Sequence, residues 1–201
     1  MKHVYAIFYV SSLLLISGSL SAQALSQQQI EDLSRLHLAD GIAELCEILS
    51  IPNNASYPAH VEANVAWCEQ AFAKRNFETK ILPTDGPPLL LASRMVSQEL
   101  PTVLIYLQID GQPVDTSRWQ QPSPYEPVLK EKTASGEWQM IDWNRLTQNY
   151  DPDWRVFARS ASDAKGPVIM FLKAMDILQE QQLQPTFNVK VIMDFEEELG
   201  S

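Results

Sequence analysis

Acidic residues follow apolar, strand-like runs at three places in this chain, and their positions restrict the folds that it can adopt. They are Asp110, Asp163 and the pair Glu197–Glu198, and each lies at or just past the end of an apolar, strand-like run. Carboxylates gathered at the strand ends of an α/β sheet are suitable ligands for a hard or borderline cation. The pattern therefore predicts an α/β sheet with a metal site at one edge.

Helical and strand-like segments alternate between these acidic positions. The spacing of apolar residues predicts helices over residues 26–49, 58–75 and 166–182. Strand-like runs occupy residues 78–82, 89–95, 102–107, 154–158 and 188–195. The continuous apolar run at 102–107 favours a strand in a sheet that is covered on both faces. Alternation of this kind predicts an α/β layered fold with a largely parallel sheet.

Residues 111–153 contain five prolines and are predicted to be a long irregular stretch. Long insertions of this kind in compact domains are often functional. The stretch holds Trp119, Trp138 and Trp143, which favour a wall around a site over a loose linker. Packing of these tryptophans beneath the loop is the simpler alternative.

The charge of the chain excludes one class of partner. The 201 residues carry a net charge of −10, so the chain lacks the basic surplus that binds nucleic acid phosphates. A solvated acidic surface explains most of this charge.

Residues 1–24 have the pattern of a signal peptide. Lys2 and His3 precede the mostly apolar run Val4–Ile16, and Ala22–Ala24 offers a cleavage site for small residues. The run is too short to span a bilayer comfortably, although an uncleaved anchor is the alternative. We expect an exported protein, periplasmic or secreted, that does not associate with the membrane once the signal is removed.

Two cysteines, Cys46 and Cys68, lie on apolar faces of predicted helices. An exported protein could pair them in a disulfide. We favour the alternative that each acts as a small buried hydrophobe.

Each acidic position also has an ordinary structural interpretation. Asp163 precedes the predicted helix at 166–182, where Asp often caps a helix. Glu197 and Glu198 follow a strand and could be a solvated loop end. The order and separation of all the acidic positions nevertheless favour a shared metal site more strongly than any single position does.

Three segments resemble the co-catalytic zinc aminoacylases and exopeptidases, a family that includes acetylornithine deacetylase, succinyl-diaminopimelate desuccinylase, glutamate carboxypeptidase and carnosinase. The segments are Tyr106–Val114, Arg159–Gly166 and Glu197–Ser201, and the resemblance covers roughly residues 27–201. It implies a three-layer zinc-exopeptidase-like α/β domain with a mostly parallel mixed sheet. Residues 25–201 would be the N-terminal part of this catalytic domain.

The resemblance also implies a role for each residue of the site. Asp163 resembles the carboxylate that bridges two metal ions, and Glu198 resembles a terminal ligand of one ion. Glu197 resembles the general base beside the metal-bound water, and Asp110 resembles the residue that orients a neighbouring ligand. Gln108 occupies the place of a histidine ligand. The implied cofactor is zinc, as one or two ions, with cobalt or manganese as alternatives. Such a cation lowers the pKa of bound water from about 15.7 to about 7.

The chain departs from the family pattern at two points. Gln108 offers a neutral amide, which is a poorer zinc ligand than imidazole. The remaining ligands and a dimerising lid domain would lie later in the parent, so we expect a truncated chain without a lid that is inactive alone. The full-length parent would be a candidate homodimer.

The sequence thus predicts a metal-dependent hydrolase of amide or peptide bonds, either a peptidase or an N-acyl-amino-acid deacylase. The substrate would be a small peptide or an N-acyl amino acid. The alternative is a non-catalytic pseudoenzyme that binds a peptide or a carbohydrate, with the three tryptophans as its platform.

Overall fold

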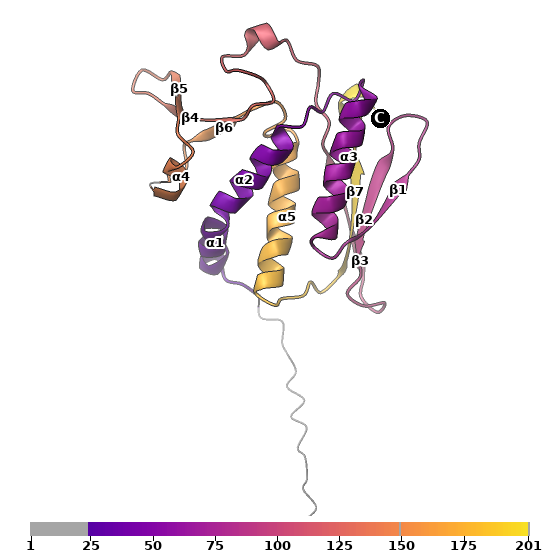
Figure 1. Ribbon diagram of the computed structural model, residues 1–201. Helices are drawn as coiled ribbons and strands as arrows, with labels where there is room; N and C mark the ends of the chain where they lie inside the picture. Colours follow the sequence, from indigo (N-terminus) through magenta and orange to yellow (C-terminus); the bar gives the residue numbers. More distant parts are fainter. Residues whose placement is uncertain (1–23, 149, 201) are drawn as a thin grey trace, which may run out of the picture.

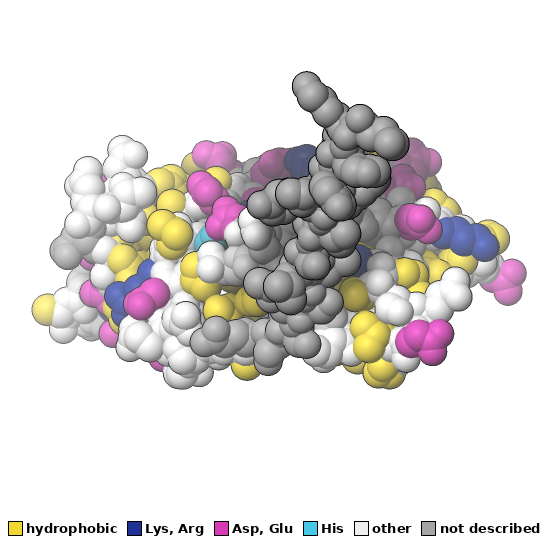
Figure 2. All heavy atoms as spheres, turned by 90° about the horizontal axis from the view of Figure 1, so that it is seen from below, with side chains coloured by type: hydrophobic (Ala, Val, Ile, Leu, Met, Phe, Trp, Pro, Cys, Tyr) yellow, Lys and Arg dark blue, Asp and Glu magenta, His cyan; other side chains and the backbone are white. Residues whose placement is uncertain are grey.

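The computed structural model describes residues 24–148 and 150–200 (Figure 1). The predicted signal peptide, residues 1–24, lies outside the described residues apart from Ala24. No helix in the described residues is both long and apolar enough to cross a membrane. Figure 2 shows Asp and Glu side chains at separate places around one face of the molecule, as expected for a solvated acidic surface.

The helices form largely where apolar spacing predicts them. They are α1 (Gln27–Leu36), α2 (Leu38–Leu49), α3 (Pro58–Ala73), α4 (Arg145–Gln148) and α5 (Lys165–Glu180). Ser26 and Gln29 cap α1 reciprocally, and Pro58 occupies the first turn of α3, where its missing N–H costs nothing. The prediction of one helix over 26–49 was wrong, because a turn at His37 divides this segment into α1 and α2. The imidazole of His37 lies 2.9 Å from Glu180 Oε2 on α5.

The main sheet has the strand order β1-β2-β7-β3 and is mixed, as predicted. Its strands are β1 (Glu78–Leu82), β2 (Leu89–Arg94), β3 (Thr102–Gln108) and β7 (Asn188–Asp194). Two of the three pairings are antiparallel, and only β3 and β7 run parallel, so the prediction of a largely parallel sheet was wrong for the described strands. This one parallel pair matters most for the site, because its register places Gln108 opposite Asp194 and brings both strand ends to one edge.

One face of the sheet packs against the helices. Alternate residues of the inner strands, including Leu90, Val189 and Val191, are almost fully buried. They join one apolar cluster with Phe72 of α3 and Leu172 of α5. Figure 1 shows the large helices gathered on one side of this sheet. The described residues therefore form a helical layer and a sheet layer around a shared core.

The other face is open along β3, so the prediction that residues 102–107 are covered on both faces was wrong. Leu104 is 61% exposed and Tyr106 is 53% exposed. Both point away from the helices, because side chains alternate along a strand and Val103 shares the helical face with Val189. β3 is also an edge strand of the described sheet.

The stretch 111–153 is not irregular, contrary to prediction. It contains a 3₁₀ turn at Thr116–Arg118, two strands and α4, and a third strand follows it. These strands, β4 (Val128–Lys132), β5 (Trp138–Ile141) and β6 (Arg155–Phe157), form an antiparallel sheet in the order β5-β4-β6. Each strand is too short to show a clear alternation of apolar and polar residues, and the prolines around the strands made the stretch resemble an irregular loop.

The tryptophans of this region have separate partners. Trp138 packs edge-to-face on Phe157, with ring centroids 5.1 Å apart. Trp119 lies beneath the guanidinium of Arg159, and Trp143 is half-buried. At least two of the three tryptophans are thus engaged in local packing.

Both cysteines are free thiols, as favoured by the sequence. Cys68 is fully buried in the apolar core, and burial raises its pKa to about 12. Burial also raises the pKa of Cys46 to about 11. Both therefore remain protonated near neutral pH and act as small hydrophobes.

Candidate active site

The residues singled out in the sequence come together at the carboxyl edge of β3 and β7. Gln108 ends β3, and Asp110 follows it. Glu197 and Glu198 lie in a short 3₁₀ turn (Glu197–Leu199) that follows β7. Asp163 reaches the same edge from the segment before α5. The expected convergence is therefore present, although it rests on one parallel strand pair.

Gln108 links two of the carboxylates. Its Nε2 donates to Glu197 Oε2 at 2.8 Å and lies 3.4 Å from Asp163 Oδ1. A neutral amide thus occupies the space between two acidic side chains, where the family resemblance implied a metal-binding histidine. An amide N–H offsets part of the repulsion between these carboxylates, but it carries no formal charge.

Asp110 supports the 3₁₀ turn Glu197–Leu199, which is called the acidic turn here. Its side chain is 2% exposed, and Oδ2 accepts the backbone N–H of Glu198 at 3.0 Å. Burial raises the pKa of Asp110 to about 6, although the hydrogen bond from Glu198 opposes the shift. The nearby charges of Asp194 and Glu198 raise it further. This geometry agrees with the orienting role expected for Asp110, because it fixes the backbone that carries Glu198.

Two loops of the site are tied to the turn that follows α2. Asn53 Nδ2 donates to Ile109 O at 2.7 Å and to Ser160 Oγ at 2.9 Å, and the N–H of Gly111 donates to Asn53 O. A side chain at position 111 would overlap Ser160 Oγ, so only glycine allows the loops to approach this closely. Asn53 thereby joins the Asp110 loop to the Asp163 loop.

Lys165 anchors the Asp163 loop from its other side. Its side chain is fully buried, and Nζ donates to the carbonyl oxygens of Ile48 at 2.8 Å and Ile51 at 2.6 Å. Burial lowers the pKa of Lys165 to about 7. The α5 N-cap is Ala164, so the capping role considered for Asp163 is wrong. The Asp163 carboxylate is exposed at the site instead.

Sequence reasoning missed two contributors. Gln112 Nε2 donates to Glu198 Oε2 at 3.0 Å. Gln112 lies in the segment that carried the resemblance, so its position was a usable signal. Asn53 gave no such signal, because Asn is common in any turn that ends a helix.

The described residues supply only part of a metal site. Asp163 and Glu198 provide two carboxylates, and Gln108 adds an amide. In residues 24–148 and 150–200, no three His, Cys, Asp or Glu side chains gather as a metal site requires. Structural zinc has four protein ligands and catalytic zinc usually has three. This set of residues does not complete a zinc site.

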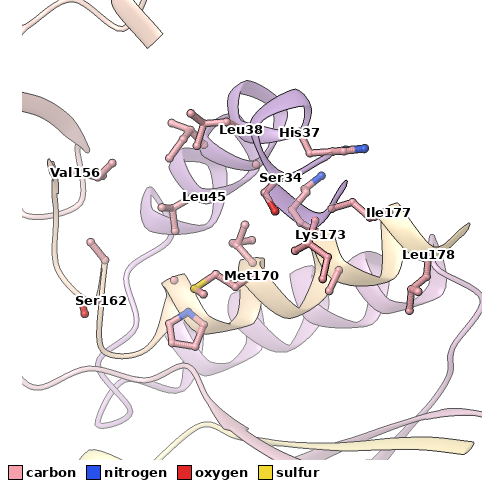
Figure 3. Close-up of a pocket in the computed structure, with 18 of the residues that line it drawn as sticks. Ser34, His37, Leu38, Leu45, Val156, Ser162, Met170, Lys173, Ile177 and Leu178 are labelled. Carbon is pink, nitrogen blue, oxygen red and sulfur yellow. The ribbon is translucent and has the colours of Figure 1, made fainter. Parts of the chain in front are cut away.

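A large cavity lies away from this edge. It has a volume of about 850 Å³ and is bounded mainly by α1, α2 and α5. Figure 3 shows that its labelled walls are mostly apolar, with Leu38, Leu45, Met170 and Ile177 among them. Ser162 borders it, so the cavity lies behind the loop that carries Asp163.

Fold and site together describe an α/β domain with carboxylates at one edge of its main sheet. Residues 104–201 match the model of Peptidase family M20/M25/M40. The resemblance inferred from the sequence is therefore confirmed for these residues, which make up just under half of the chain.

Individual relatives agree with this assignment. The chain is similar to "Beta-Ala-His dipeptidase" of Mus musculus, with 30% identity over 115 residues, which cover 57% of this chain and 19% of that protein. It is similar to "Cysteinylglycine-S-conjugate dipeptidase" of Corynebacterium striatum, with 26% identity over 161 residues, or 78% of this chain and 30% of that protein. The chain thus spans less than a third of either relative.

A solved structure confirms the fold class. Human carnosine dipeptidase 1 superimposes with a TM-score of 0.66 at 20% identity, and the match covers 85% of this chain and 34% of that one. At this identity the likeness establishes the α/β fold alone.

Proposed function

We propose that this chain supplies part of the active site of a metal-dependent hydrolase of amide or peptide bonds. The convergence of Gln108, Asp163, Glu197 and Glu198 at one sheet edge carries the proposal. The family match and the dipeptidase relatives support peptide-bond hydrolysis as the reaction. Small peptides are the favoured substrates, with N-acyl amino acids as the related class.

We assign the roles as follows. Asp163 and Glu198 are the metal-binding carboxylates, and zinc is the favoured ion, with cobalt or manganese as alternatives. When bound, the ion would make water acidic enough to lose a proton near neutral pH. Glu197 would serve as the general base, and Gln108 Nε2 holds the Glu197 carboxylate in place through the 2.8 Å hydrogen bond. Asp110 positions Glu198 through its backbone N–H.

The donor set indicates that the 201-residue chain does not turn over substrate by itself. Two carboxylates and one amide leave a zinc ion underligated, so its affinity is low and its position is poorly fixed. The described residues also present the site at an exposed edge, where water is not excluded. Both features favour weak metal binding without catalysis.

We expect the purified chain to bind zinc weakly and to hydrolyse neither dipeptides nor N-acyl amino acids. Asp163→Asn and Glu198→Gln should each weaken zinc binding by about tenfold or more, because each removes a charged ligand. Equilibrium dialysis with metal analysis measures the binding. Chromatography of the substrate mixtures, with zinc added, measures hydrolysis.

Asp153→Asn is the matched control, because Asp153 is an exposed carboxylate in the small-sheet region. It should bind zinc like the unaltered chain. Zinc-dependent turnover would contradict the inactivity of the chain. Unchanged zinc binding in both site variants would contradict the assigned ligands.

A pseudoenzyme that binds peptide or carbohydrate is the second candidate. The observation that favours it is the amide of Gln108, which donates to two carboxylates at the position where the resemblance implies a histidine ligand. Retention of a peptide by the chain in the presence of a chelator, with no zinc bound, would favour this candidate over the hydrolase.

A further inference from the structure

A second, smaller cavity lies beneath Asp110, on the side away from the acidic turn. It is a narrow space where the start of α3 meets the ends of β3 and β7. Its polar walls are Asn53, His60, Asn64 and Asp110. Asn53, Asn64 and Asp110 are each at most 3% exposed, so this is an interior site rather than a surface groove.

Every one of these four residues carries a buried polar atom without a hydrogen-bond partner in the described structure. The atoms are Asn53 Oδ1, His60 Nδ1, Asn64 Oδ1 and Asp110 Oδ1. A buried polar atom left unpaired destabilises the fold, because it has lost its hydrogen bonds to water and gained none in the protein. Four such atoms around one small space indicate that a ligand satisfies them together.

The hydrogen bonds of the two asparagines fix which amide atom is left unpaired. Asn53 Nδ2 donates to the carbonyl oxygen of Ile109, and Asn64 Nδ2 donates to those of Pro52 and His60. Carbonyl oxygens only accept, so each amide nitrogen must face them. The unpaired amide atoms are therefore oxygens, and with Asp110 Oδ1 they make three acceptors that lack a donor.

The charge around the cavity favours a cation over a neutral ligand. Asp110 brings one carboxylate, and the charges of Asp194 and Glu198 act on it. The cavity also has almost no room for a sphere as large as a water molecule, whereas a dehydrated sodium ion is smaller. Oxygen ligands suit hard cations, and one carboxylate balances one positive charge.

We propose that this cavity is a binding site for a monovalent cation of the sodium class, with Asn53 Oδ1, Asn64 Oδ1 and Asp110 Oδ1 as its ligands and His60 in its wall. The site is separate from the exposed carboxylate edge. The two meet at Asp110, whose other oxygen accepts the N–H of Glu198. A bound ion thereby holds Asp110 in the orientation that supports the acidic turn. The proposal does not depend on the hydrolase function.

The test is thermal unfolding of the full chain in the chlorides of sodium, potassium and choline at equal ionic strength. We expect a saturable rise in melting temperature with sodium, of about 5 °C at a concentration about 100 times the Kd, and a smaller rise with potassium. Sodium-23 NMR line broadening on the same protein gives a second, direct measurement of binding.

Asp110→Asn locates the site. Its amide can still accept from Glu198 N through oxygen while its nitrogen donates to the asparagine oxygens in the cavity. The variant should therefore fold and lose its dependence on sodium. Glu62→Gln removes the same charge from an exposed position on α3 and should keep that dependence.

Two results would overturn the proposal. Equal melting temperatures in all three salts, with no line broadening, would mean that the cavity holds no cation. A sodium effect that persists in Asp110→Asn would place the ion elsewhere in the protein.

Discussion

Replacing Gln108 with histidine is expected to raise the zinc affinity of this chain by about tenfold or more, equivalent to about 1.4 kcal/mol. The side chain at position 108 already lies between the Asp163 and Glu197 carboxylates. An imidazole nitrogen there would give zinc a third good ligand at about 2.0–2.1 Å, in place of a weakly donating amide. Zinc titration followed by metal analysis of the dialysed protein measures both affinity and stoichiometry.

Gln112→His is the matched control for this substitution. Gln112 is a second glutamine at the same edge, and its amide donates to Glu198. Gln112→His therefore makes the same chemical change beside the proposed ligand Glu198, but not at the position where the resemblance implies a histidine. An equal rise in affinity for both variants would contradict a specific role for position 108. No rise in Gln108→His would contradict it as well.

The clustering of acidic residues could be predicted from the sequence, because it follows directly from the positions of these residues at the ends of strands. Gln108 follows one apolar run and Glu197 follows another, and parallel neighbouring strands end at the same edge. The support beneath the cluster could not be predicted in this way. Asn53 and Lys165 act through backbone carbonyls that only the folded chain brings within reach.

The fold could be predicted to a similar extent, and the errors in that prediction have physical causes. Helix α3 and strands β1 and β2 follow apolar spacing closely. Strand β6 was predicted within residues 154–158, but β4 and β5 were missed because they are only five and four residues long and partly exposed, which gives a weak alternating pattern. The apolar run of β3 predicted burial, but apolar composition does not specify which neighbours cover each face. Leu104 and Tyr106 are exposed because no described element covers their face of the strand.

Arg75 is expected to be among the costliest side chains to remove from this fold. It is 5% exposed and connects three helices. Its guanidinium donates to Glu44 on α2 at 2.8 Å, to Asp176 on α5 at 2.7 Å, and to the carbonyl oxygens of Ala71 and Leu172. Arg75→Met keeps much of the volume but leaves both carboxylates and both carbonyls short of a donor. We expect a loss of about 3–5 kcal/mol in the free energy of unfolding, measured by urea denaturation at neutral pH.

Lys173→Met distinguishes this network from a simple ion pair. Lys173 Nζ contacts the same carboxylates, Glu44 at 2.8 Å and Asp176 at 2.9 Å, but its side chain is more exposed than that of Arg75. Its removal should cost about 1 kcal/mol, as for a partly exposed pair. Similar losses in both variants would contradict a distinct role for Arg75.

The pH dependence of the Arg75 effect follows from the same contacts. Burial alone would raise the pKa values of Glu44 and Asp176, but hydrogen bonds from Arg75 and Lys173 outweigh it and hold both below their ordinary values. A carboxylate with a lowered pKa in the folded state stabilises the fold above its unfolded pKa, which is about 4, and this contribution is lost as the pH falls through the folded value. Arg75→Met removes part of that lowering. The stability gap between the two proteins should therefore be full at neutral pH and shrink in acid. A gap that stays constant from pH about 7 to about 3 would mean that Arg75 acts through packing rather than charge.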